Sequence, residues 1–131
     1  AMDLGQIDLA IEDGGFARNE ALLAFVGTLR ASGGRAHLLG VASDGGVHGH
    51  LNHMVAAAEA LAAAGVPVRV HAVTDGRDVA PTSAPLYLAA LAARLPGSAR
   101  LATVMGRFYA MDRDRRWERV RLAYDALVHA Q

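Results

Sequence analysis

The 131-residue sequence contains neither cysteine nor lysine. Without cysteine the chain can form neither disulfides nor thiolate metal sites, which fits a cytoplasmic protein. No uninterrupted apolar run approaches the roughly 18 residues of a membrane-spanning helix, so we expect no membrane partner. The first residues also lack the basic and then apolar pattern of a secretory signal.

An excess of charge is also missing, because 13 basic residues balance 13 acidic ones. General polyanion binders are basic overall, so we expect no nucleic-acid partner. All basic residues are arginine, whose planar fork suits phosphate and carboxylate. An arginine- and alanine-rich composition is also typical of GC-rich genomes, so only the placement of individual arginines can indicate function.

What the sequence does contain is an alternation of strand-like and helical patterns. Short apolar runs predict buried strands at 36–42, 68–73 and 101–105. Apolar residues at helical spacing predict helices over 7–11, 22–29, 51–62 and 117–127, and one from Pro81, which suits a first turn, to Leu95. Three strand–loop–helix units predict an α/β fold with a parallel sheet between two helical layers.

The size of the chain favours a single α/β unit spanning residues 1–131. Three strands are few for such a three-layer sandwich. We therefore expect the chain to be a truncated part of a larger α/β domain.

Each predicted strand is followed by a polar, glycine-containing loop. Ligands of parallel α/β sheets bind outside the carboxyl ends of the strands, where helix N-termini also favour anions. The three loops should therefore form one site for a small phosphorylated or carboxylated ligand. They would contribute His48, Arg77, Arg107 and Arg113 together with Asp44, Asp75, Asp78 and Asp112.

Each of these side chains also has a plainer interpretation. A loop arginine is more often a solvated charge or an ion-pair partner than a ligand contact. The arginine-rich stretch 113–121 is typical of a solvated helix face with ion pairs four residues apart. The cluster of His48, His50 and His53 lacks a strong metal-ligand spacing and favours surface or capping roles.

Four further residues with functional side chains are expected in the core. His37 and His71 lie within predicted strands and should be satisfied core histidines. Trp117 and Tyr124 follow the apolar stripe of the last helix, so they are predicted to be core residues rather than stacking platforms. None of the GxxxxGK[ST], GxGxxG, GxSxG or HExxH motifs is present.

Three long motifs closely resemble those of the cofactor-independent phosphoglycerate mutases, in the same order and spacing. They are residues 43–50 (SDGGVHGH), 75–83 (DGRDVAPTS) and 106–117 (GRFYAMDRDRRW). Residues 11–16 (IEDGGF) and Asn19 resemble that family too. The resemblance covers nearly the whole chain.

The resemblance implies a glycolytic, cytoplasmic enzyme that interconverts 3- and 2-phosphoglycerate through a phosphoserine. In that family a phosphatase-like domain holds the serine and two metal ions, usually manganese. A second, phosphotransferase domain is inserted into it and binds the glyceric acid. By motif match the substrate-binding residues would be His48, Arg77, Asp78, Arg107 and Arg113, with Asp78 a candidate acid or base.

The departures from the family pattern limit what this chain should do. No segment resembles the serine or metal-ligand motifs, and a further arginine-rich motif would lie beyond Gln131. Gly49 stands where the family usually has serine. The chain thus resembles the first part of the inserted domain, and the phosphatase-like domain would be its partner. We expect no metal, cofactor or certain catalytic residue in it and no mutase activity by itself.

A non-enzymatic interpretation stays open beside this one. The same loops would suit a stand-alone anion-binding or interaction module that keeps the fold without the reaction. A serine nucleophile and metal ligands elsewhere in the parent gene would favour the enzyme. Nucleic-acid binding is a distant third, since it predicts steeply salt-dependent binding that the neutral charge does not favour.

Overall fold

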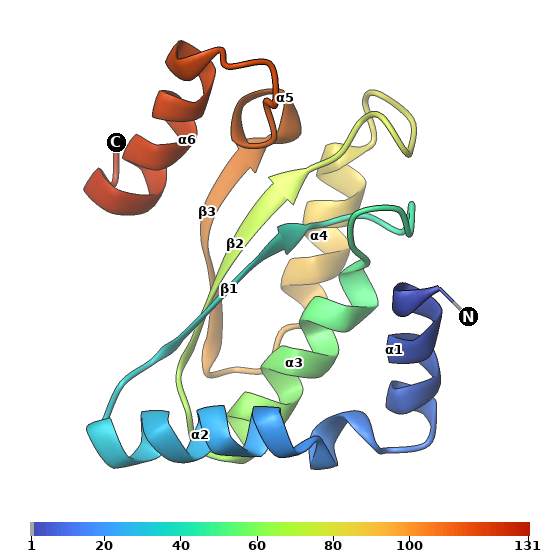
Figure 1. Cartoon of the computed structure of the whole chain (residues 1–131), viewed down its shortest axis with the longest axis vertical. Helices are drawn as coiled ribbons and strands as arrows, with labels where there is room; N and C mark the ends of the chain where they lie inside the picture. The colour runs from blue at the N-terminus through green and yellow to red at the C-terminus, as the bar shows by residue number, and fades with distance from the viewer. Residues whose placement is uncertain (1) are drawn as a thin grey trace.

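The computed structural model describes residues 2–131 as three parallel strands with helices around them (Figure 1). The sheet has the order β1-β2-β3, and both pairs are parallel. The expected α/β fold with a helix-flanked parallel sheet is confirmed. The elements are α1 (Asp3–Glu12), η1 (Phe16–Arg18), α2 (Glu20–Ser32), β1 (Ala36–Val41), α3 (Leu51–Ala63), β2 (Val68–Thr74), α4 (Ala84–Arg94), β3 (Ala99–Gly106), α5 (Arg107–Ala110) and α6 (Trp117–His129).

Local chemistry explains where several helices begin and end. The Asn19 side chain caps α2 by accepting a hydrogen bond from the Leu22 amide at 3.1 Å. Gly33 ends the same helix with a φ of 66°, which glycine adopts without steric cost. The placement of Pro81 in the first turn of α4 was wrong. That helix begins at Ala84, and Pro85 takes the first turn because its missing N–H needs no partner there.

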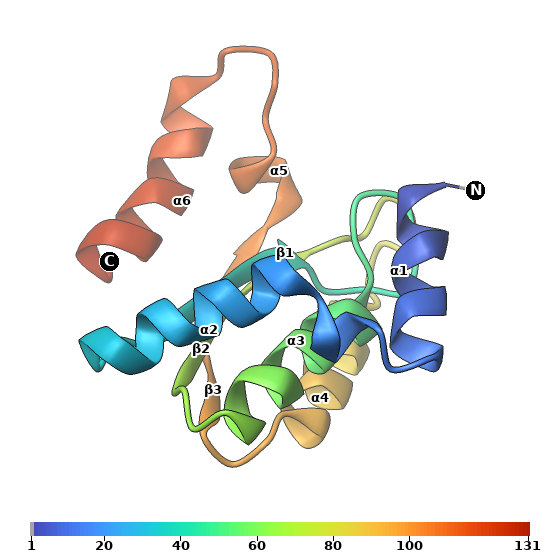
Figure 2. The same cartoon turned by 60° about the horizontal axis from the view of Figure 1, so that its bottom comes forward.

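One face of the sheet carries the main apolar core. Small and β-branched residues of the strands pack against α2, α3 and α4, which together exclude water from this face (Figure 2). The strands can lie close under α3 because their side chains are short. The most buried core members include Ala36, Val68, Val70, Ala72, Leu61 and Leu91.

The other face of the sheet is covered only at its carboxyl end. There Val41, Val73 and Met105 pack against Ala123 of α6, with α5 beside it (Figure 2). Farther from this end, Leu39 stays 60% exposed. The sheet thus has helices on both faces, but the second helical layer is small.

Two residues of α6 do not lie where the sequence placed them. Trp117 is 69% exposed and Tyr124 is 51% exposed, so the prediction that they belong to the core was wrong. The only buried residue of α6 is Ala123, whose small side chain lets the helix approach the sheet. The larger side chains of α6 have no covering element among the described residues.

A polar chain crosses the more open face of the sheet. His37 Nδ1 lies 2.8 Å from His71 Nε2, and His71 Nδ1 lies 2.8 Å from Thr103 Oγ1. His71 is buried and satisfied, as predicted. His37 is exposed, and its prediction as a core residue was wrong because no helix covers this part of β1.

Within residues 2–131, none of the helices combines the length and the apolar character needed to cross a membrane.

The histidine chain should make stability depend on pH. Burial, and then the neighbouring His37, lower the pKa of His71 below 6.5 in the folded state. The unfolded chain therefore takes up the proton first on acidification. The stabilisation is complete above about pH 6.5 and is lost as the pH falls through and below that value.

We expect the free energy of unfolding from urea titrations to fall between about pH 7.5 and pH 5.5. His71→Gln should reduce this fall, because glutamine hydrogen bonds but does not titrate there. His129→Gln, at the exposed end of α6, should retain it. Equal pH dependence in the wild type and His71→Gln would contradict the assignment.

Candidate functional site

The loops after the three strands meet around one cavity of about 890 Å³ at the carboxyl edge of the sheet. This edge is the end toward which the strand arrows point in Figure 1. The volume lies within the range of small-molecule sites. All five residues predicted to bind the ligand line it, namely His48, Arg77, Asp78, Arg107 and Arg113. Their common location is as expected, while their binding roles stay predictions.

The cavity is built on a buried carboxylate, Asp75, the first residue after β2. Its side chain is 2% exposed and accepts four hydrogen bonds. The side-chain donors are Ser43 Oγ at 2.6 Å and Arg107 Nη1 at 2.8 Å. The backbone donors are the amides of Arg77 at 3.1 Å and Asp78 at 3.0 Å. Asp75 therefore joins the loops after all three strands.

These bonds keep Asp75 ionised. Burial is the largest single influence and by itself would raise the pKa of this carboxyl. The hydrogen bonds from Ser43, from the Asp78 and Arg77 amides and from Arg107 outweigh it and lower the pKa to about 2. Asp75 is thus a fixed negative charge at any ordinary pH.

Arg107, the first residue of α5, is held by two acids. Its Nη1 donates to Asp75 Oδ1 and to Asp78 Oδ2, both at 2.8 Å. The hydrogen bond to Asp78 is the largest of the influences that raise the pKa of this guanidinium. Arg107 is therefore an ion-pair partner, which is one of the plainer interpretations of a loop arginine. Both bonds use the same nitrogen, and the described residues accept no hydrogen bond from Nε or Nη2 of this guanidinium.

Two arginines of the cavity have side chains without a protein partner. Within residues 2–131, the guanidinium groups of Arg77 and Arg113 make neither a hydrogen bond nor an ion pair with another side chain. The cavity is lined by five arginines and four aspartates, which leaves one excess positive charge. Arg77 and Arg113 contribute two positive charges, and the group of Arg107, Asp75 and Asp78 has one excess negative charge.

The remaining arginines of the cavity, Arg116 and Arg119, pair with the buried side chain of Asp112. Asp112 accepts hydrogen bonds from the Arg116 and Asp114 amides, and it pairs with the side chains of Arg116 at 3.4 Å and Arg119 at 3.7 Å. The hydrogen bond from the Arg116 amide is the main cause that lowers the pKa of Asp112. The expected ion pairs four residues apart are present here and between Arg121 and Asp125.

An aromatic wall completes the cavity. Phe108 is 57% exposed, and the guanidinium of Arg119 lies 3.8 Å from its ring centroid. The ring also meets Tyr109 edge-to-face at 5.1 Å. Sequence reasoning did not select Phe108. It named Asp75 among the acids of the three loops but not among the ligand-binding residues, because position at a strand end does not reveal which charges are paired.

The N-terminus of α3 contributes less to the site than its position suggested. His50 caps it by accepting from the Asn52 amide at 3.0 Å, a role that the sequence favoured. The Leu51 amide donates to the Ser43 carbonyl, so these donors are already used. These two amides of α3 are therefore not available to an anion.

His53 and the other potential metal ligands do not gather. His53 Nε2 lies 2.6 Å from Asp8 Oδ1 and ties α3 to α1. Among residues 2–131 no three histidine, aspartate or glutamate side chains are arranged to hold a metal ion.

Comparisons with known proteins identify relatives along the whole chain. The protein-family model described as "BPG-independent PGAM N-terminus" matches residues 7–131. The chain is 67% identical over 131 residues to the 2,3-bisphosphoglycerate-independent phosphoglycerate mutase of Dinoroseobacter shibae. It is 64% identical to the protein of that name from Ruegeria pomeroyi and 63% identical to the one from Paracoccus denitrificans. Each match covers all of this chain and 26% of the relative, so the chain spans about a quarter of these proteins.

Gly45, in the loop after β1, packs tightly against Asp75 and Asp78, and this leads to a prediction. A Cβ added at Gly45 would lie 2.9 Å from Asp78 Cβ and 3.2 Å from Asp75 Oδ2. Gly45→Ala should therefore displace the aspartates and destabilise the chain by about 1–3 kcal/mol. Urea denaturation measures the loss.

Gly97→Ala is the matched control, because nothing lies within 4 Å of its added Cβ. It should change stability by no more than about 0.5 kcal/mol. Equal stability of the two variants would show that the loop relaxes without cost.

Proposed function

This chain belongs to the family of BPG-independent phosphoglycerate mutase N-terminal regions, and we propose that it is the substrate-binding part of such a mutase. Its ligand would be phosphoglycerate, the substrate that the names of its relatives indicate. The observation that carries the proposal is the pair of unpaired guanidinium groups, Arg77 and Arg113, in the cavity at the strand ends.

The charge distribution of the cavity supports a ligand with two anionic groups. Phosphoglycerate carries a phosphate and a carboxylate, and an arginine fork can bind either through two parallel hydrogen bonds. Arg77 and Arg113 come from the loops after different strands, so they can engage separate ends of one molecule. The Nε and Nη2 groups of Arg107, which bond to none of the described residues, would add further donors.

Asp78 and His48 would act on the free hydroxyl of the glycerate. Asp78 Oδ2 accepts a hydrogen bond from Arg107 Nη1 at 2.8 Å, and a carboxylate oxygen can accept a second hydrogen bond, here from the hydroxyl. In our proposal Asp78 accepts the hydroxyl proton as that oxygen attacks the phosphoryl group, so it serves as the base. His48 has a side chain free of partners among the described residues and would orient the same hydroxyl.

We propose that the remainder of the full-length polypeptide carries out the other steps of the reaction. There the family resemblance places the phosphatase-like domain, with the serine that carries the phosphoryl group and two metal ions, which we expect to be manganese. The metals would supply Lewis-acid activation of the phosphoryl group. Residues 1–131 would then form the first part of the inserted phosphotransferase domain of a cytoplasmic, glycolytic isomerase.

Ligand binding by this chain can be tested by NMR titration with 3-phosphoglycerate, with sulfate and glycerate as controls. We expect amide shifts confined to the loops at 43–50, 75–83 and 106–117, at lower concentrations than sulfate requires. Arg77→Ala and Arg113→Ala should each weaken binding about tenfold or more, because each removes a charged hydrogen-bonding partner.

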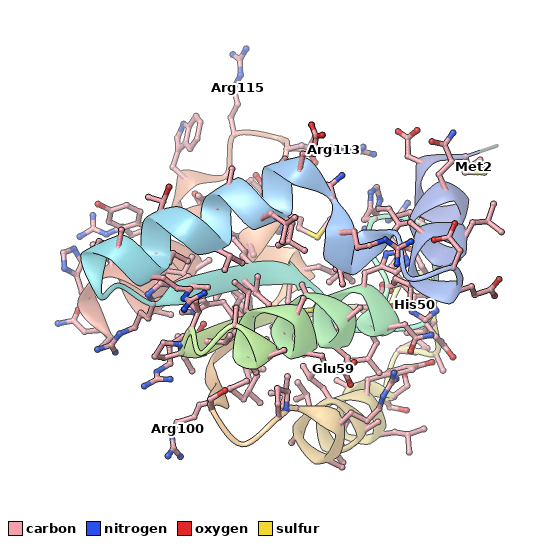
Figure 3. All side chains as sticks on the ribbon, turned by 90° about the horizontal axis from the view of Figure 1, so that it is seen from below. Met2, His50, Glu59, Arg100, Arg113 and Arg115 are labelled. Atoms are coloured by element: carbon pink, nitrogen blue, oxygen red, sulfur yellow. The ribbon has the colours of Figure 1, made fainter. Side chains whose placement is uncertain are left out.

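Arg100→Ala is the matched control for these variants. Arg100 lies at the amino end of β3, away from the cavity, and Figure 3 shows it well separated from Arg113. This variant should bind like the wild type. Shifts no stronger than those from sulfate, or equal losses in all three variants, would contradict a specific site.

The isolated chain should not interconvert 3- and 2-phosphoglycerate. No positioned serine to receive the phosphoryl group is identified in it, and transfer depends on such positioning. Phosphorus NMR distinguishes the two isomers, and a full-length relative provides the positive control. Turnover by the purified chain, persisting through further purification, would refute this expectation.

A further inference from the structure

We propose that Asp75 is a positioning residue of the phosphoglycerate site. It holds the Arg107 guanidinium at one nitrogen and fixes the loop that carries Arg77 and Asp78. The inference rests on the proposed function and deepens it. All four of the hydrogen bonds that Asp75 accepts come from the protein, so we assign it a role through its neighbours.

The partners of Asp75 show what it organises. Ser43 follows β1, Arg77 and Asp78 follow β2, and Arg107 follows β3. None of these bonds belongs to the ladders between strands or to the apolar core. Asp75 thus connects the binding loops to one another.

The geometry of Arg107 explains why its position matters. Asp75 Oδ1 and Asp78 Oδ2 both accept from Nη1, and the described residues accept no hydrogen bond from Nη2 or Nε. The guanidinium of this cavity-lining residue is therefore held at one nitrogen, and its other donors have no protein partner among the described residues. A donor fixed before binding loses less conformational entropy than a mobile one when the ligand arrives.

Charge alone predicts the opposite role for Asp75. A carboxylate beside an anion site should repel the ligand, so its removal should strengthen binding. A buried ion pair is also a weak source of stability, since apolar replacements are often neutral or stabilising. If Asp75 positions the site, its neutralisation should instead weaken phosphoglycerate binding, and the two interpretations differ in sign.

The test compares three variants of this chain by NMR titration with 3-phosphoglycerate and sulfate. Asp75→Asn removes the charge at nearly constant volume, and Asp75→Glu keeps the charge but lengthens a side chain that is only 2% exposed. Asp114→Asn removes an equal charge from a lining residue that is 66% exposed and is paired only with Arg116.

We expect both Asp75 variants to weaken 3-phosphoglycerate binding about tenfold or more, while Asp114→Asn does not weaken it. Sulfate should bind Asp75→Asn at least as well as the wild type, because the net charge is more positive. Unchanged or tighter phosphoglycerate binding by Asp75→Asn would overturn the proposal. Wild-type binding by Asp75→Glu would overturn it as well, since charge would then suffice.

A readout without ligand separates this inference from the proposed function. In the wild type the Arg107 Nε–H should give one sharp NMR signal, and in Asp75→Asn that signal and the amides of 43–50 should broaden or shift. If the wild type fails to bind phosphoglycerate, the proposed function fails while this readout still decides the role of Asp75. Unchanged spectra would refute it.

Ser43→Ala keeps the test decisive if Asp75→Asn does not fold. It removes one of the four bonds to Asp75 and leaves the carboxylate in place. We expect it to weaken phosphoglycerate binding about threefold or more. Binding equal to the wild type would contradict the proposed role.

Discussion

The cavity depends on one buried negative charge. Parallel strands end side by side, but proximity alone does not fix the loops that follow them. Asp75 does so by accepting four hydrogen bonds from groups after β1, β2 and β3. Burying a carboxylate is costly unless its oxygens are satisfied, and here the cost is offset by a nearly complete set of donors. The same donors lower its pKa to about 2.

The arginines of the cavity divide into three kinds because the aspartates pair with only some of them. Arg116 and Arg119 pair with Asp112, and Arg107 is held at one nitrogen by Asp75 and Asp78. Arg77 and Arg113 keep their full charge for a ligand. A nearly neutral cavity can thus still present localised positive charge. That pattern favours a small, doubly anionic molecule over an extended polyanion, whose binding needs many adjacent cations.

The sheet and α6 leave apolar surface exposed. Leu39 on β1, and Leu122 and Val128 on α6, are each more than half exposed. The relatives are about four times as long as this chain, which covers 26% of each. In the proposed full-length mutase, other parts of the polypeptide would cover such surface, since large exposed apolar patches mark contacts with further structure.

The sequence by itself determined the α/β class, the three strands and the edge of the sheet where His48, Arg77 and Arg113 lie, because hydrophobic periodicity and strand ends are local properties. Motifs as long as 106–117 also sufficed to indicate the family. Only the tertiary structure decided which charges are paired, since Asp75 and Arg107 are 32 residues apart and meet only when β2 and β3 align. It also decided burial: Trp117 has a core-like side chain, but exposure depends on which elements pack against it, and no local pattern encodes that.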